Sequence, residues 1–117
     1  ESAALSATLV TQELIGEMAA AVAREANPEA IILFGSHASG DARPDSDVDL
    51  LVVETAPFGP DNDRRREMTR LWRALAEFKV AKDILVFSSE EVERWRGARN
   101  HVVARALREG RLLYGRL

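Results

Sequence analysis

Apolar side chains recur along this chain with two different spacings, and each spacing predicts a different kind of element. Where apolar positions lie three or four residues apart, they fit a helix that buries one face. Such helices are predicted over 11–26, from Asp61 or Asp63 to about Phe78, from Glu90 onward, and over 102–109. Short segments that are mostly apolar and lie between turn residues predict strands instead. These segments are 30–34, 48–53 and 82–87, of which only 30–34 is apolar throughout.

The order of these segments predicts the class of fold. Strands alternate with helices, and a small sheet backed by helices buries the apolar faces of both. The chain is therefore expected to be an α/β protein, with a further short helix or turn over 36–40. In the helix that ends near residue 78, the side chains expected to face the core are Met68, Leu71, Trp72, Leu75 and Phe78.

Composition sets limits on size and surroundings. With 117 residues, of which 46% are hydrophobic and 30% charged, the chain is expected to form one globular domain over 1–117. No apolar run approaches the roughly 18 residues of a membrane span. The opening ESAALS lacks the features of a secretion signal, so a cytoplasmic location is expected. Because the chain begins at Glu1 without Met, further residues are expected before it. The absence of Cys excludes disulfides and thiolate sites.

Charge is distributed unevenly along the chain. Residues 1–57 carry 2 basic and 10 acidic groups, whereas residues 58–117 carry 14 basic and 9 acidic groups. The basic excess includes a cluster of arginines in one predicted helix: Arg64, Arg65, Arg66, Arg70 and Arg73. Such a cluster can attract a triphosphate, a nucleic acid or an acidic protein surface. It is equally consistent with a solvated helix face.

Two aspartates at the start of the second predicted strand carry the strongest chemical signal. Side chains two residues apart on a strand point to the same face, so Asp47 and Asp49 direct two carboxylates toward one point. They repel each other unless a cation lies between them. Hard divalent cations such as Mg²⁺ prefer oxygen ligands and keep positions open for phosphate oxygens. The pair therefore predicts a metal–nucleotide site, the alternative being an exposed strand edge.

Small and polar residues precede these aspartates. Gly35 has no Cβ, so phosphates can approach its backbone closely. Ser36 offers a hydroxyl beside a helix N-terminus that can bind an anion, or it simply caps that helix. Arg43 is the nearest cation to the aspartates and is a candidate phosphate ligand. Ser46 either orients the aspartates through hydrogen bonds or completes the preceding turn.

These residues form a pattern that resembles a known family. A Gly-Ser pair, a spacer of ten residues and Asp-x-Asp on a strand are similar to the signature of the nucleotidyltransferases typified by DNA polymerase beta. The run GDARPDSDVDLLVV resembles the minimal nucleotidyltransferase (MNT) domain proteins, and the closing ALREGRLLYGRL resembles their ends. MNT proteins are commonly paired with HEPN-domain toxins in prokaryotic toxin–antitoxin modules. The resemblance implies a mixed, twisted sheet with acidic residues clustered on one face.

A third aspartate is expected to complete the site. In-line nucleotidyl transfer works better with two metal ions than with one, which calls for another carboxylate on a neighbouring strand. Asp83 is the only acidic residue in the predicted strand 82–87. The resemblance implies that Asp83 holds the catalytic Mg²⁺ and helps to deprotonate the attacking hydroxyl, while Asp47 and Asp49 bridge two Mg²⁺ ions. Taken alone, Asp83 would equally suit a solvated cap or an ion pair.

The resemblance also implies an activity and a partner. The expected function is Mg²⁺-dependent transfer of AMP from ATP to a hydroxyl, a tyrosine of a HEPN toxin, by which this chain acts as an antitoxin in a hetero-oligomer. Nucleic acid is not expected as a direct substrate, because 117 residues leave no room for the additional domains of a polymerase. Two alternatives stay open: an antitoxin that neutralises its toxin by binding alone, and an enzyme that modifies a small molecule.

The histidines and tryptophans carry weaker signals. His37 and His101 have no ligand-like spacing and are interpreted as structural or surface residues. Trp72 and Trp95 lie at amphipathic positions and are expected in the core or at an interface.

Overall fold

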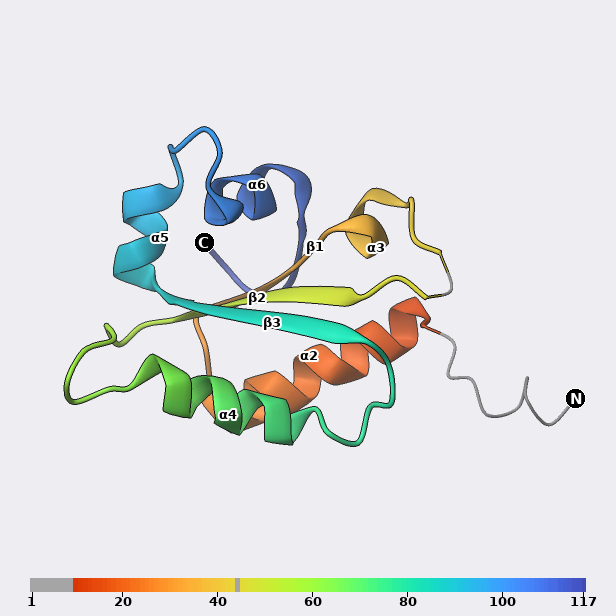
Figure 1. Ribbon diagram of the computed structural model, residues 1–117, viewed down its shortest axis with the longest axis horizontal. Coiled ribbons are helices and arrows are strands. Elements are labelled where there is room, and N and C mark those ends of the chain that lie inside the picture. The colour runs from red at the N-terminus through yellow and green to blue at the C-terminus, as the bar shows by residue number, and fades with distance from the viewer. Residues whose placement is uncertain (1–9, 44) are drawn as a thin grey trace, which may run out of the picture.

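The computed structural model describes residues 10–43 and 45–117, and in these ranges helices and strands alternate as the apolar pattern predicts (Figure 1). The elements are α2 (Gln12–Ala26), β1 (Ala30–Phe34), α3 (Ser36–Ser39), β2 (Val48–Glu54), α4 (Arg64–Ala74), β3 (Lys82–Ser88), α5 (Ser89–Trp95), α6 (Val102–Glu109) and β4 (Arg111–Gly115). None of the described helices combines the length and the apolar character that crossing a bilayer requires.

The four strands form one sheet in the order β3-β2-β1-β4. Strand β2 runs parallel to β3, whereas β1 is antiparallel to both of its neighbours, β2 and β4. The predicted α/β class and the mixed sheet are confirmed. The closing apolar segment, for which no strand was predicted, adds β4 to the sheet beside β1.

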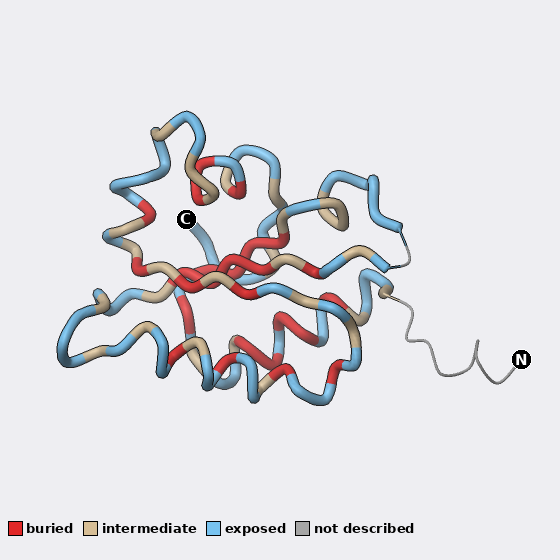
Figure 2. The backbone as a smooth tube through the Cα atoms, viewed as in Figure 1, coloured by how far each residue is buried: buried red, intermediate tan, exposed pale blue. Residues whose placement is uncertain are grey.

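Helices lie on both sides of the sheet (Figure 1), and much of the strand backbone is buried between them (Figure 2). Alternate residues of β2 belong to two different core clusters. Leu50 and Val52 of β2 belong to the cluster that packs against α2 and α4. Leu51 and Val53 belong to the cluster that packs against α5 and α6. Since side chains alternate along a strand, Asp49 lies on the α5–α6 face of the sheet.

Polar residues define the helix ends. Thr11 accepts a hydrogen bond from the Leu14 amide, and Asp63, one of two candidates, caps α4 through the Arg65 amide. Ser88 caps α5 in a reciprocal pair with Glu91. These local bonds satisfy amides that have no partner inside the helix.

The prediction of a core position for Trp72 is wrong. Leu71 and Leu75 are fully buried, but Trp72 is 38% exposed. A helix turns by about 100° per residue, so Trp72 points sideways from the face that carries Leu71. The Lys82 Nζ atom lies 5.5 Å from the centre of its ring. Trp72 therefore covers the start of β3 and does not fill the core.

Candidate active site

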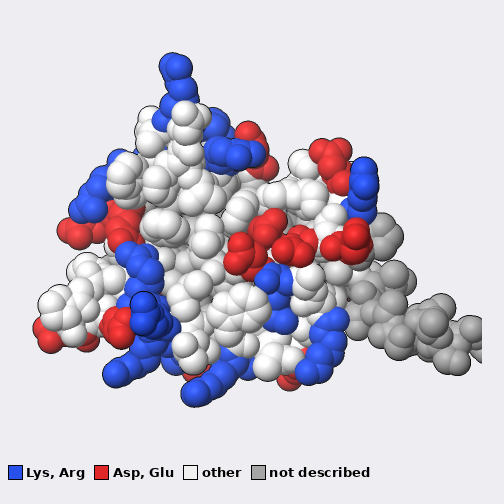
Figure 3. Space-filling view, in the orientation of Figure 1, with Lys and Arg blue, Asp and Glu red and all other residues white. Residues whose placement is uncertain are grey.

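Asp49 and Asp83 lie side by side on neighbouring strands. They are register partners in the parallel pair β2–β3, both near the N-terminal ends of their strands. Residues paired in a sheet project their side chains from the same face. Asp47 precedes β2 by one residue and its charge acts on Asp49, so the three predicted ligands lie near the same end of the two strands. Figure 3 shows a row of acidic side chains on the displayed side of the molecule.

The ionisation of Asp49 reports how closely these carboxylates interact. Burial, and after it the negative charges of Asp83 and Asp47, raise the pKa of Asp49 from its ordinary value of 3.8 to about 6. His37 lowers the pKa of Asp49 electrostatically and so partly offsets this rise. Repulsion between like charges is the cause of the two smaller contributions. A proton or a cation that binds between the aspartates would therefore relieve this repulsion.

Gly35 lies directly against the Asp49 carboxylate. Strand β1 ends at Phe34, which is the register partner of Asp49, and the chain then turns with φ of +78° at Gly35. A Cβ atom at Gly35 would lie 2.2 Å from Asp49 Oδ2. Both the left-handed backbone and this close approach require glycine. The small residue thus brings the backbone of the β1–α3 turn against the acidic cluster.

Ser36 begins the short helix α3 and is half-buried. Its carbonyl oxygen accepts hydrogen bonds from the amides of Gly40 and Asp41, and from the Ser39 hydroxyl. Gly35 is the residue at the N-cap position and supplies no side-chain cap. The prediction that Ser36 caps this helix is therefore wrong, because Ser36 is the first residue of α3 and Gly35 takes the N-cap position. The other predicted role, a hydroxyl beside the start of the helix, agrees with its position.

Arg43, the predicted phosphate contact, and Ser46 are hydrogen-bonded to each other in the loop before β2. The Arg43 amide donates to Ser46 Oγ over 2.8 Å, and the Ser46 amide donates to the Arg43 carbonyl over 3.0 Å. The Arg43 side chain itself is exposed. Of the two roles considered for Ser46, the geometry supports turn formation.

His37 has a place at the site that its spacing in the sequence did not indicate. Its Nε2 atom lies 3.1 Å from the Ser46 carbonyl oxygen, which ties α3 to the loop before β2. The same ring influences the ionisation of Asp49. His37 is therefore structural, as predicted, but it also faces the acidic cluster. His101, in contrast, caps α6 through the Val103 amide and stacks on Trp95.

The aspartates fit a divalent cation in their chemistry. Within 10–43 and 45–117, no group of three or more His, Asp or Glu side chains already converges in the arrangement of a metal site. However, Asp49 and Asp83 are neighbours, and the pKa of Asp49 is raised by burial and by both other carboxylates. Oxygen ligands that repel one another are the donor set that Mg²⁺ compensates. The residues present therefore fit the ion.

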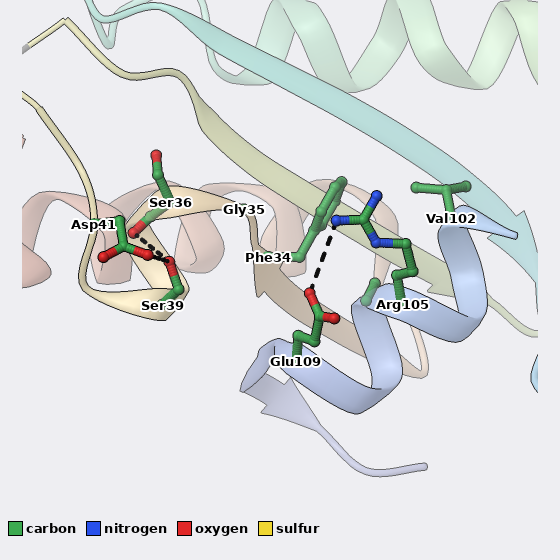
Figure 4. Close-up of a pocket in the computed structure, with 9 residues that line it drawn as sticks. Phe34, Gly35, Ser36, Ser39, Asp41, Val102, Arg105 and Glu109 are labelled. Carbon is green, nitrogen blue, oxygen red and sulfur yellow. Dashed lines mark hydrogen bonds and ion pairs between the residues drawn. The ribbon is translucent and has the colours of Figure 1, made fainter. Parts of the chain in front are cut away.

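A cavity of about 490 Å³ opens beside Gly35 and Ser36, between α3 and α6 (Figure 4). It is lined by Phe34, Gly35, Ser36, Ser39, Asp41, Val102, Arg105, Ala106 and Glu109. Arg105, which no sequence motif indicated, lines this cavity from α6. Only the packing of α6 on β1 reveals it.

The arginine cluster of α4 lies on the opposite face of the sheet. Two of its members form ion pairs: Arg64 with Glu91, and Arg70 with both Glu67 and Glu25. Arg64 also donates to the Val86 carbonyl of β3. These contacts support the interpretation of the cluster as a structural and solvated helix face.

At the other end of β2, Glu54 and Glu67 form a buried acid pair. Burial, and then the hydrogen bond and the negative charge of Glu67, raise the pKa of Glu54 to about 8. Although burial opposes it, hydrogen bonds with Glu54 and Arg70 lower the pKa of Glu67. Glu54 Oε2 is buried without a hydrogen-bond partner. Glu54 is therefore protonated at neutral pH and Glu67 is ionised.

Glu54→Gln is expected to stabilise the protein at alkaline pH. A carboxyl group whose pKa is higher in the folded than in the unfolded state stabilises the fold at low pH, and this contribution is lost as pH rises through about 8. The amide mimics the protonated acid, so the variant should melt about 4 °C higher than the wild type at pH 9 and at the same temperature at pH 5. Thermal unfolding followed by circular dichroism at both pH values measures this. An equal shift at both values would contradict the prediction, and the exposed Glu77→Gln is the control.

Comparison with known proteins agrees with the fold described above. The family model described as Polymerase beta, Nucleotidyltransferase matches residues 17–116. A predicted nucleotidyltransferase from Sulfolobus solfataricus has a similar structure, with a TM-score of 0.62 and 23% identity over 89% of this chain and 79% of that one. No curated protein matches significantly.

Toxin–antitoxin complexes also share the fold. One solved with AMP-PNP has a TM-score of 0.55 and 21% identity, over 86% of this chain and 73% of that one. Another holds a tri-AMPylated Shewanella oneidensis HEPN toxin with its MNT antitoxin, with a TM-score of 0.51 and 20% identity over 91% and 74% of the two chains. At these identities the likeness concerns the fold. With the family model matching most of the chain, the protein belongs to the polymerase beta nucleotidyltransferase family.

Proposed function

We propose that this protein is a Mg²⁺-dependent nucleotidyltransferase that transfers AMP from ATP to a hydroxyl group of a partner protein. The observation that carries the proposal is the register of Asp49 with Asp83, with the Gly35 backbone against the Asp49 carboxylate. This places two carboxylates beside a turn that a nucleotide can approach closely. The exposed Asp47 joins them from the loop.

Each residue has a proposed role in the transfer. Asp47, Asp49 and Asp83 would hold two Mg²⁺ ions, which supply charge neutralisation at the phosphates when bound. The acceptor oxygen forms a bond to the α-phosphorus while the bond from that phosphorus to the α,β-bridging oxygen breaks. Pyrophosphate leaves with the bonding electrons, and Asp83, which is exposed, accepts the proton of the hydroxyl.

The β1–α3 turn and the loop before β2 would bind the nucleotide. Gly35 lets the phosphates approach the backbone, and Ser36 presents its hydroxyl at the start of α3. Arg43 is exposed on the loop and is proposed as a phosphate contact. Ser46 contributes indirectly, because its hydroxyl holds the Arg43 amide.

Structures of similar fold support a protein as the acceptor. They include a complex of a tri-AMPylated HEPN toxin with its MNT antitoxin and a toxin–antitoxin complex with AMP-PNP. We propose that the partner of this chain is likewise a HEPN-type toxin and that modification of its tyrosine makes this chain an antitoxin. ATP is then the nucleotide donor.

Transfer of label tests the proposal. The protein is incubated with α-labelled ATP, Mg²⁺ and the product of the neighbouring gene, and Asp47→Ala/Asp49→Ala is run in parallel. Label should enter the partner with the wild type and fall at least about 100-fold with the variant. Neutralisation of the partner by the variant without label would support a binding antitoxin instead. Label that enters a small molecule but not the partner would support a small-molecule enzyme.

A further inference from the structure

The cavity between α3 and α6 adjoins the acidic cluster through Gly35. Gly35 lines this cavity and also contacts Asp49. Ser36 lines it from the same turn, and Val102 and Arg105 line it from α6. A nucleotide seated on the Gly35–Ser36 turn would therefore face α6 across a space of about 490 Å³.

Arg105 is held only weakly in its present position. Its Nη2 atom lies 3.9 Å from Glu109 Oε1, and the two side chains are 65% and 60% exposed. Exposed pairs of this kind contribute little to stability. In Figure 4 the Arg105 guanidinium lies beside the Phe34 ring and the dashed line joins it to Glu109. The guanidinium can therefore exchange Glu109 for a stronger anion at little cost.

Lys82, which precedes Asp83 in the chain, is engaged in the structure of the sheet. Its ammonium donates to the carbonyl oxygens of Phe78, over 2.9 Å, and Val80, over 3.3 Å. Three aspartates already give this end of the sheet a negative charge, so a polyphosphate needs positive charge from another direction. Arg105 lines the cavity from that direction.

We propose that Arg105 binds the β- and γ-phosphates of the nucleotide across the α3–α6 cavity, releasing Glu109 as it does so. The inference rests on the proposed function and adds a residue from α6 to its binding site. A guanidinium matches phosphate with two parallel hydrogen bonds. Because these phosphates leave as pyrophosphate, Arg105 would distinguish ATP from AMP. The Glu109 carboxylate would weaken nucleotide binding, since it competes with the phosphates for the Arg105 guanidinium.

Calorimetric titration with MgATP, AMP and pyrophosphate tests this in the whole protein. Arg105→Ala should weaken binding of MgATP and pyrophosphate about 10-fold or more and leave AMP binding within about 2-fold. Arg105→Lys should restore part of the loss. The matched control is Arg108→Ala, which removes an exposed arginine of the same helix outside the cavity lining. Circular dichroism checks that each variant is folded.

The paired carboxylate gives a second, opposite readout. Glu109→Gln should tighten MgATP binding about 2-fold, and this gain should vanish in the Arg105→Ala background. Equal MgATP affinity of Arg105→Ala and Arg108→Ala would overturn the inference, even if label transfer succeeds. Arg105-dependent MgATP binding without any label transfer would support the inference and overturn the transferase proposal. A wild type that binds neither MgATP nor pyrophosphate would overturn both.

Discussion

Asp49→Asn is expected to reduce nucleotidyl transfer roughly 1,000-fold and at the same time to raise the melting temperature. Asp49 is the most buried of the three aspartates and faces both of the others. Its carboxylate is costly to the fold because burial and repulsion disfavour its charge. The amide keeps the shape but loses the charge that a metal ligand needs. The charge of Asp49 is therefore expected to serve the reaction while it lowers the stability of the fold.

The effect on stability has a defined dependence on pH. Because the pKa of Asp49 is raised to about 6 in the folded protein, the wild type loses stability as pH rises through this value. The variant does not lose this stability. At pH 8 its free energy of unfolding should therefore exceed that of the wild type by about 1 kcal/mol, which raises the melting temperature by roughly 4 °C. At pH 4 the two proteins should melt at the same temperature. Thermal unfolding at both pH values, without and with Mg²⁺, measures this.

Mg²⁺ provides the control for this prediction. It should raise the melting temperature of the wild type at pH 8 and leave Asp49→Asn unchanged, since a ligand that binds the folded state stabilises it. Asp61→Asn, an exposed change in the loop before α4, should retain both the wild-type activity and the response to Mg²⁺. A variant that melts lower than the wild type at pH 8 would show that Asp49 serves the fold.

Gly35→Ala is expected to destabilise the protein by about 3 kcal/mol and to lower transfer at least about 100-fold. An L-residue is strained at φ of +78°, which costs about 1 kcal/mol or more. The added Cβ would also overlap Asp49 Oδ2 at 2.2 Å, and forced displacement of packed atoms costs roughly 1–3 kcal/mol. Since the overlap moves the carboxylate, activity should fall further than stability. Chemical denaturation and label transfer measure the two effects.

Gly40 offers a matched control. It also has a positive φ, +89°, but an added Cβ there would meet nothing within 4 Å. Gly40→Ala should therefore cost only about 1 kcal/mol. In an Asp49→Ala background, which removes the colliding carboxylate, Gly35→Ala should cost no more than Gly40→Ala. Equal costs of Gly35→Ala with and without the carboxylate would contradict a direct contact.

Most elements of the fold follow from short-range patterns in the sequence. The apolar spacing of 11–26 predicted α2, and the run 30–34 predicted β1 with the same bounds. Asp63 was one of the two residues predicted to begin α4, and it is the N-cap. These features depend on interactions between residues a few positions apart, which a linear pattern records. The strand β4 was missed because its apolar run is short and its pairing depends on a distant partner, β1.

Some features of the candidate site likewise follow from local sequence, whereas others depend on the tertiary structure. Asp47 and Asp49 share a face because strand geometry alternates, and glycine at position 35 follows from the motif, so both could be predicted from local sequence. The register of Asp49 with Asp83, the contact of Gly35 with Asp49, the approach of His37 and the position of Arg105 depend on how distant segments pack. That packing depends on the apolar area that several helices and strands bury together. The spacing of residues within one segment does not determine how distant segments pack, so these contacts could be identified only from the tertiary structure.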